Sequence, residues 1–460
     1  MKQMNKIIML SMSSALAGMA GGAHASGFQL IEQNASGLGN AYAGQAAAAE
    51  DASTIYFNPA GMTRLPGKNL VFAGHLIKPS ATFNNTGTTQ AASTSAGTGL
   101  FALNGNGGDA GDLAVIPSAY LSWQLGPQLF AGVGVSVPFG LKTDYDSNWM
   151  GRFHALKSEI KTINVNPSIA YKLNDTISLG AGLNYQHVEA ELTKAVNYSF
   201  VGQSIGVGAG VEGSNKIEGK DNAWGFNLGL MFNPRPNTNI GVSYRSAMNF
   251  KLSGNATYFG RPAALNTAIA GGFGAAVQAS AFNQVGDSPI TADVKLPATF
   301  SAALKHQIDP KWDVLADATW TQWSTLKSLN VVRSNNAVLE STPFEWRDTW
   351  RIGLGVNYRP SATWTVRAGV AYDQTPTSDT YRTPRLPDGS RTWLALGGQY
   401  KVSKAGAIDF GYAHLFVKDP TVALTGPPAL SAAAALGRGN LVGNYDSKVD
   451  ILSVQYRHTF

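Results

Sequence analysis

The chain has 460 residues, no cysteine and a formal net charge of +6, and only 14% of its residues are charged. The lack of cysteine excludes a secreted domain held together by disulfides, and the scattered basic residues argue against nucleic acid as a partner. No stretch of about 18 consecutive apolar residues follows the N-terminal region, which argues against a helical membrane protein.

The first 25 residues have the pattern of a cleaved signal peptide. Lys2 and Lys6 precede a short apolar segment at 7–20, and the small-x-small sequence that ends at Ala25 is typical of a cleavage site. We therefore expect export and a mature chain that begins at Ser26, with a formal charge of +4 once the two lysines are removed.

Residues 26–67 differ from the rest of the chain because they contain no run with a period of two. Their Gly and Pro breaks predict short helices, and at Asn58-Pro59-Ala60 the proline cannot continue a helix while the asparagine can cap or turn. A segment of this kind ahead of a closed barrel is expected to pack in the lumen as a plug, or hatch.

From residue 68 onward, apolar and polar residues alternate in many segments. In the last segment one face consists of Leu452, Val454, Tyr456, His458 and Phe460, and the other of Ser453, Gln455, Arg457 and Thr459. A strand with one apolar and one hydrated face suits the wall of a transmembrane β-barrel. The terminal Phe460 is the residue that we expect the barrel assembly machinery to recognise.

The connections between these segments alternate between short and long, as expected for barrels with short periplasmic turns and long outer loops. The segment count predicts an all-β, antiparallel barrel of about fourteen strands over 68–460, with the sixth beginning near Trp224 and the last near Lys448. The Ala-rich loop from Ala263 to Phe282 places Phe273 and other apolar residues near helical spacing, so it could collect an apolar ligand at the cell surface.

Several motifs together carry a resemblance to a known family. They are Gly27-Phe28-Gln29-Leu30, Ser36-Gly37-Leu38-Gly39, Asn58-Pro59-Ala60, Val137-Pro138-Phe139-Gly140-Leu141, Asn148 to Ala155, Asn164 to Tyr171 and Arg382-Thr383-Pro384-Arg385-Leu386-Pro387-Asp388. The chain resembles the FadL-type family of outer-membrane transporters for long-chain fatty acids and other hydrophobic compounds. The resemblance covers essentially the whole mature chain.

The resemblance implies a barrel with an N-terminal hatch that binds hydrophobic substrates and releases them sideways into the membrane through a kinked third strand. Here that strand is 129–141, and Gly132, Gly134 and Pro138 should weaken its ladder next to Phe139 and Gly140. The alternative is that these residues only bend a barrel corner.

The same resemblance places Phe28 and Leu30 at the binding pocket and Asn58-Pro59-Ala60 in the hatch motif. The alternative for Phe28 and Leu30 is that they only pack the plug against the wall. The alternative for Asn58-Pro59-Ala60 is a simple helix break. Arg351 and Arg367 fall on inward positions, where a cation could hold a fatty carboxylate. The favoured reading of these two arginines is a network of Arg–Asp pairs that props the barrel.

We therefore expect passive uptake of hydrophobic compounds across the outer membrane of a Gram-negative bacterium. Long-chain fatty acids are the first substrate class, and aromatic hydrocarbons, an adhesin role and a general porin are the alternatives. The expected partners are a hydrophobic small molecule, membrane lipid and lipopolysaccharide. With 7 His, no Cys and no metal-ligand spacing, the chain is expected to have no catalytic, metal or cofactor site. Lateral release also favours a monomer, since neighbours would block the wall.

Overall fold

The computed structural model describes residues 27–460, and the predicted signal peptide lies outside them. All strand segments belong to one antiparallel sheet that closes where β1 (Lys68–Asn85) pairs with β20 (Leu441–Thr459). The segments form fourteen strands, which confirms the predicted barrel. Closure removes the two free edges that an open sheet would expose in a membrane.

Eight of the strands are continuous and six are interrupted. Besides β1 and β20, the continuous strands are β2 (Ala114–Gln124), β5 (Lys157–Lys172), β6 (Ile177–Asn197), β7 (Glu212–Arg235), β16 (Trp364–Asp373) and β17 (Arg391–Lys401). The interrupted strands are β3 (Leu129–Ser136) with β4 (Gly140–Asp144), β8 (Thr238–Arg245) with β9 (Met248–Phe259), β10 (Ser288–Leu296) with β11 (Thr299–Gln307), β12 (Trp312–Thr321) with β13 (Ser328–Arg333), β14 (Val338–Pro343) with β15 (Thr349–Tyr358), and β18 (Gly406–Val417) with β19 (Thr421–Leu424).

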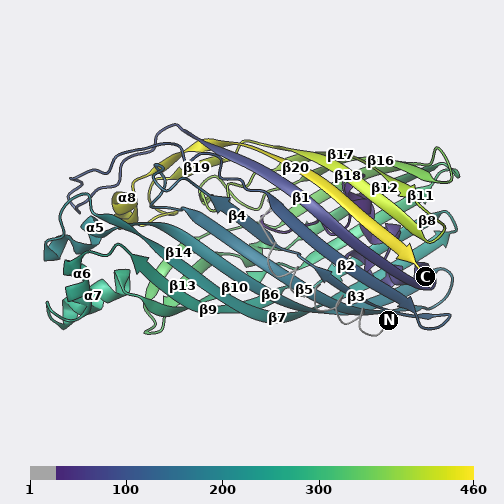
Figure 1. Ribbon diagram of the computed structural model, residues 1–460, viewed down its shortest axis with the longest axis horizontal. Coiled ribbons are helices and arrows are strands. Elements are labelled where there is room, and N and C mark those ends of the chain that lie inside the picture. The colour runs from purple at the N-terminus through teal and green to yellow at the C-terminus, as the bar shows by residue number, and fades with distance from the viewer. Residues whose placement is uncertain (1–26) are drawn as a thin grey trace.

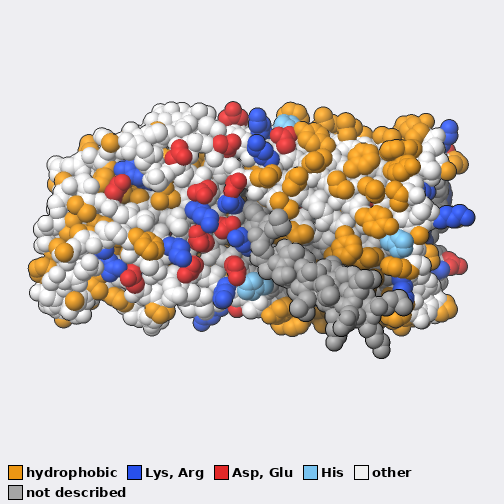
Figure 2. Space-filling model, in the orientation of Figure 1, with side chains coloured by type: hydrophobic (Ala, Val, Ile, Leu, Met, Phe, Trp, Pro, Cys, Tyr) orange, Lys and Arg blue, Asp and Glu red, His pale blue; other side chains and the backbone are white. Residues whose placement is uncertain are grey.

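The alternation in the sequence separates a lipid-facing from a lumen-facing side. On β20, Leu452 and Val454 are 50% and 53% exposed, whereas Ser453 and Gln455 are each 1% exposed. Hydrophobic side chains gather over one half of the barrel, and a belt of charged residues borders them (Figure 2). This apolar half is the part that suits the hydrocarbon layer.

The two ends of the barrel differ. Long loops and the helices α5 (Tyr198–Gly202), α6 (Ala263–Ile269), α7 (Ala275–Val285) and α8 (Ala432–Arg438) lie at one end, and the short turns and the C-terminus lie at the other (Figure 1). The short 3₁₀ helix η2 (Gln203–Ile205) follows α5, and a second one, η3 (Trp323–Thr325), lies between β12 and β13 within the wall. Within 27–460, no helix is long and apolar enough to cross a membrane.

The N-terminal segment forms the hatch and is buried within the barrel. It contains α2 (Ala35–Leu38), α3 (Gln45–Ala48), α4 (Thr54–Phe57) and the 3₁₀ helix η1 (Pro59–Arg64). Glu50 fastens this segment to the wall through ion pairs with Lys305 at 2.9 Å and Arg367 at 2.8 Å. Such buried pairs hold the hatch in one position because removal of either partner would leave an unpaired charge.

Candidate functional site

An apolar cavity lies in the lumen on the loop side of the hatch. Its empty volume is about 1040 Å³, part of it open to solvent. Most of its lining is aliphatic and comes from the parts of the strands that lie toward the loop end. These residues include Leu141, Ile160, Val188, Leu192, Ile217, Leu252, Ile290, Val294, Leu296, Leu329 and Val331.

Aromatic side chains form the floor of this cavity. The ring of Phe28 lies 5.1 Å from that of Trp323 and 5.9 Å from that of Trp346, and the two indoles are 5.0 Å apart. Phe139 closes one side, with its ring 5.9 Å from Phe28. Contacts of this kind stabilise the cluster by more than burial alone, so we call Phe28, Phe139, Trp323 and Trp346 the aromatic floor.

Arg385 is the only cation in the lining of the apolar cavity. Its Nη1 donates to Ser158 Oγ at 3.0 Å and to the Thr193 carbonyl at 3.3 Å, and no carboxylate oxygen in the described part of the chain lies within 4.0 Å of it. Burial lowers the pKa of Arg385 to about 10, so the group stays charged at neutral pH. The other charged lining residue, Glu218, is paired with Lys216 at 2.7 Å.

The loop between β16 and β17 positions Arg385. Arg382 Nε donates to the Asp388 carbonyl at 2.8 Å, and Thr375 Oγ1 donates to the Asp388 carboxylate at 2.6 Å. The same carboxylate accepts from the Gly27 amide at 3.1 Å. This loop therefore holds both the cation of the cavity and the start of the hatch.

The wall next to the aromatic floor is interrupted between β3 and β4. The main chain of the hatch fills the interruption: the Leu30 amide donates to the Pro138 carbonyl at 2.8 Å, and the Gly140 amide donates to the Phe28 carbonyl at 2.9 Å. Gln33 Nε2 also donates to the Val137 carbonyl at 2.9 Å. At this position the hatch replaces part of a wall strand.

Gly132 and Gly134 behave differently from the sequence-based expectation, because the ladder is continuous there on both sides of β3. A Cβ on Gly132 would lie 2.6 Å from Ile55 Cδ1 and 2.8 Å from Met62 Sδ. A Cβ on Gly134 would lie 2.7 Å from the Tyr120 ring. The two glycines thus provide room for the hatch and for Tyr120, and the interruption begins only at Val137.

The Asn58-Pro59-Ala60 motif joins α4 to η1, as its residues predict. Asn58 Oδ1 accepts from the Ala60 amide at 3.1 Å, and its Nδ2 donates to the carbonyls of Ala46 at 2.7 Å and Leu230 at 3.0 Å. The side chain therefore caps a helix and ties the hatch to β7 at the same time.

The remaining predicted residues lie outside the apolar cavity. Arg351 pairs with Asp317 at 3.4 Å, and Arg367 pairs with Asp409 at 2.7 Å, in the kind of Arg–Asp network favoured above. Leu30 is fully buried in a cluster of hatch and wall residues. Phe273, 47% exposed, and Phe282 lie on the outer loop that carries α6 and α7.

A plugged barrel with an apolar outer band and an apolar cavity in its lumen has the properties of an outer-membrane transport protein for hydrophobic compounds. The family model described as outer membrane protein transport protein (OMPP1/FadL/TodX) matches residues 16–460. A 47 kDa outer membrane protein of Pasteurella multocida is 30% identical over 99% of this chain and 100% of its own. The long-chain fatty acid transport protein of Escherichia coli is 26% identical over 85% of this chain and 88% of its own.

A solved structure agrees with these matches. The FadL homologue of Pseudomonas aeruginosa superimposes with a TM-score of 0.84 and 28% identity, covering 94% of this chain and 100% of that one. The chain belongs to the OMPP1/FadL/TodX family of outer-membrane transporters for hydrophobic compounds. Its place is the outer membrane.

Proposed function

We propose that this protein takes up long-chain fatty acids. The observation that carries the proposal is Arg385, a cation without a carboxylate partner at an otherwise apolar cavity. An acyl chain would gain free energy from the aliphatic lining, and a guanidinium would hold the carboxylate by charge-assisted hydrogen bonds. The Escherichia coli relative is named for transport of the same substrate class, long-chain fatty acids.

We further propose that the ligand leaves sideways through the interruption at Val137-Pro138-Phe139, next to Gly140. The support is that no wall strand fills this position, and that main-chain bonds from Phe28 and Leu30 close it. Because Phe28 belongs to the aromatic floor as well, a ligand that displaces this ring also loosens the segment that closes the wall.

Collection by the outer loop is the first step of the proposed route. Phe273 and Phe282 lie on the loop of α6 and α7, at the end that faces away from the short turns. The route then runs from this loop to the apolar cavity and out through the interruption, driven by diffusion.

The test is competition between oleate, oleyl alcohol and toluene for the purified barrel in lipid nanodiscs. We expect saturable oleate binding that is tighter than binding of oleyl alcohol and is not displaced by toluene. Toluene binding with no preference for the carboxylate would replace this proposal with hydrocarbon uptake. Binding of none of the three would favour the adhesin alternative.

A further inference from the structure

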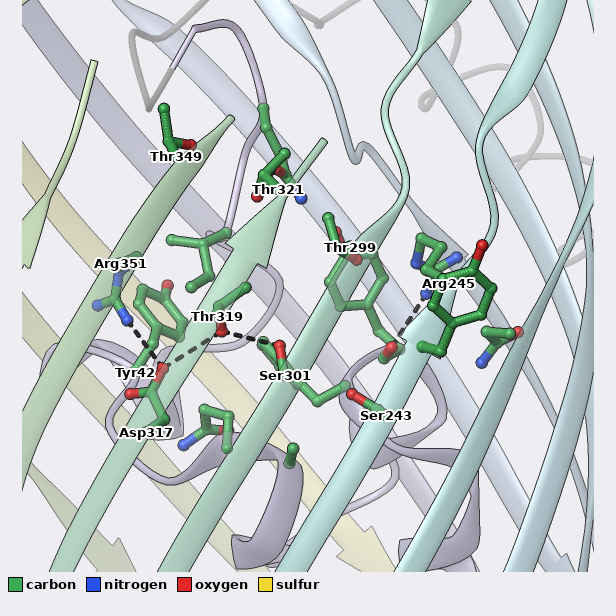
Figure 3. A pocket seen from close by; sticks show the side chains of 18 of the residues that line it. Tyr42, Ser243, Arg245, Thr299, Ser301, Asp317, Thr319, Thr321, Thr349 and Arg351 are labelled. Carbon is green, nitrogen blue, oxygen red and sulfur yellow. Dashed lines mark hydrogen bonds and ion pairs between the residues drawn. The ribbon is translucent and has the colours of Figure 1, made fainter. Parts of the chain in front are cut away.

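A second cavity lies on the other side of the aromatic floor, and it is lined by polar and charged side chains together with apolar ones such as Ile31, Phe57 and Leu228 (Figure 3). It has an empty volume of about 900 Å³ and is enclosed by the hatch and by β7, β8, β11, β12 and β15. We call it the polar chamber. Six of its hydroxyl-bearing residues are Ser243, Thr299, Ser301, Thr319, Thr321 and Thr349.

The boundary between the two cavities is sharp along the chain. After β12, Trp323 belongs to the aromatic floor, whereas Thr321, two residues earlier, lines the polar chamber. Before β15, Trp346 lines the apolar cavity and Thr349 lines the chamber. The chamber is therefore a separate compartment on the short-turn side of Phe28.

One cation of the chamber has only neutral partners. Arg245 donates to Asn184 Oδ1 and, at 2.9 Å, to the Tyr56 carbonyl, and its guanidinium lies 4.4 Å from the centroid of the Tyr56 ring. Across residues 27–460, no carboxylate oxygen comes within 4.0 Å of this side chain. Arg351, on the other side of the chamber, differs because it is paired with Asp317 at 3.4 Å.

Hydroxyl groups extend from Arg245 across the wall of the chamber. Ser243 on β8 is the register partner of Ser301 on β11, and Ser301 is the partner of Thr319 on β12. The Ser301 and Thr319 hydroxyls are 2.8 Å apart. Figure 3 shows Ser301, Thr319 and Thr299 between Arg245 and the Arg351–Asp317 pair. The Thr319 hydroxyl also donates to Asp317 Oδ2 at 3.4 Å, so the Ser301–Thr319 pair is already engaged, and Ser243 and Thr299 are the hydroxyls that can donate to an anion held at Arg245.

We propose that the polar chamber is a binding site for a carboxylate group, with Arg245 as its cation. A desolvated cation is costly unless an opposite charge accompanies it, and the planar fork of a guanidinium matches the two oxygens of a carboxylate. This site is distinct from Arg385 and does not depend on the fatty acid proposal. Its ligand is either a small water-soluble carboxylate or the head group of a longer acid that has passed the aromatic floor.

The test uses hexanoate as the probe and hexanol as its uncharged match. Saturation-transfer NMR measures their binding to the barrel in nanodiscs, in an Arg385→Gln background that removes the cation of the apolar cavity. We expect hexanoate to saturate a site from which hexanol does not displace it. Adding Arg245→Gln should weaken this binding at least tenfold, and Arg245→Lys should weaken it less because the charge remains.

Arg235→Gln is the matched control, since Arg235 is exposed at the β7–β8 turn and should leave hexanoate binding unchanged. Unchanged affinity in Arg245→Gln, or full displacement by hexanol, overturns the proposal. If Arg245→Gln fails to fold, as judged by heat-modifiable migration, the Ser243→Ala, Thr299→Val variant replaces it. A threefold loss of hexanoate affinity is then expected, and no loss is the overturning result.

Competition with oleate identifies the source of the carboxylate. Displacement of hexanoate by oleate in the Arg385→Gln background assigns the chamber to the head group of a long acid. Hexanoate that stays bound assigns it to small soluble carboxylates. Either result is separate from the fatty acid proposal, which is tested by the preference of the unmodified protein for oleate over oleyl alcohol.

Discussion

Replacement of Arg385 by glutamine gives the sharpest test of the proposed substrate class. The change removes the positive charge from the apolar cavity, together with the Nη1 hydrogen bonds to Ser158 and the Thr193 carbonyl, but keeps a polar side chain. The aliphatic lining is untouched, so any effect should depend on the carboxylate of the ligand and not on its chain.

The expected magnitude follows from the local geometry. No carboxylate oxygen of the described residues lies within 4.0 Å of Arg385, and the nearby Glu340 is paired with Lys194 and Arg438, so a ligand carboxylate could form direct hydrogen bonds to the Arg385 guanidinium. Hydrogen bonds to charged groups contribute about 1.5–3 kcal/mol, which corresponds to a roughly tenfold to hundredfold loss of oleate affinity. Binding of oleyl alcohol should change by less than about threefold, since its hydroxyl does not depend on the cation.

The assay is equilibrium binding of radiolabelled oleate and oleyl alcohol to each variant in nanodiscs. Arg385→Lys should recover part of the affinity for oleate, and Arg235→Gln at the exposed turn should change neither ligand. Equal loss of both ligands would mean that Arg385 only supports the loop. Unchanged oleate affinity would refute its role as the partner of the carboxylate.

Three further predictions concern the hatch and the wall. Pro138→Val restores an amide at the interruption, so uptake by cells should fall while oleate binding stays within about threefold. Phe28→Ala opens the aromatic floor, so oleate affinity should drop about tenfold and ion conductance in planar bilayers should rise, with the wall still folded. In Gly229→Val, whose Cβ would lie 2.0 Å from Asn58 Oδ1, the hatch should become protease-sensitive. Normal uptake by Pro138→Val would contradict the first prediction, and unchanged conductance of Phe28→Ala would contradict the second. Protease resistance of the hatch in Gly229→Val would contradict the third.

The barrel could be predicted from the sequence because its signal recurs in strand after strand. Where the alternation of apolar and polar residues stops, the predicted strands are too short. The strand β7 begins at Glu212 and not near Trp224, and β20 begins at Leu441 and not near Lys448. These extensions lie toward the loop end, where the outer face is charged or polar. A strand outside the apolar band has no reason to alternate in hydrophobicity.

The binding site was harder to predict than the fold. Arg351 and Arg367 fall on inward positions of strands, and they pair with Asp317 and Asp409, as the favoured interpretation of these two arginines predicts. Arg385 lies in a loop, where no strand periodicity marks the direction of a side chain. The signal that could have found it is the Arg382 to Asp388 motif, whose other members tie the loop to itself and to Gly27.

On the proposed lateral route, ligand binding and wall opening would be coupled through the first residues of the hatch. Glu50 and Asn58 hold the body of the hatch, whereas the segment that closes the wall depends on few bonds, among them those from Phe28 and Leu30 to the edges of the interruption. Each such bond contributes about 0.5–1.5 kcal/mol net. A ligand favours the open wall only by the difference between its affinities for the open and the closed state. On the proposed route, displacement of Phe28 supplies that difference, and the rest of the hatch remains in place.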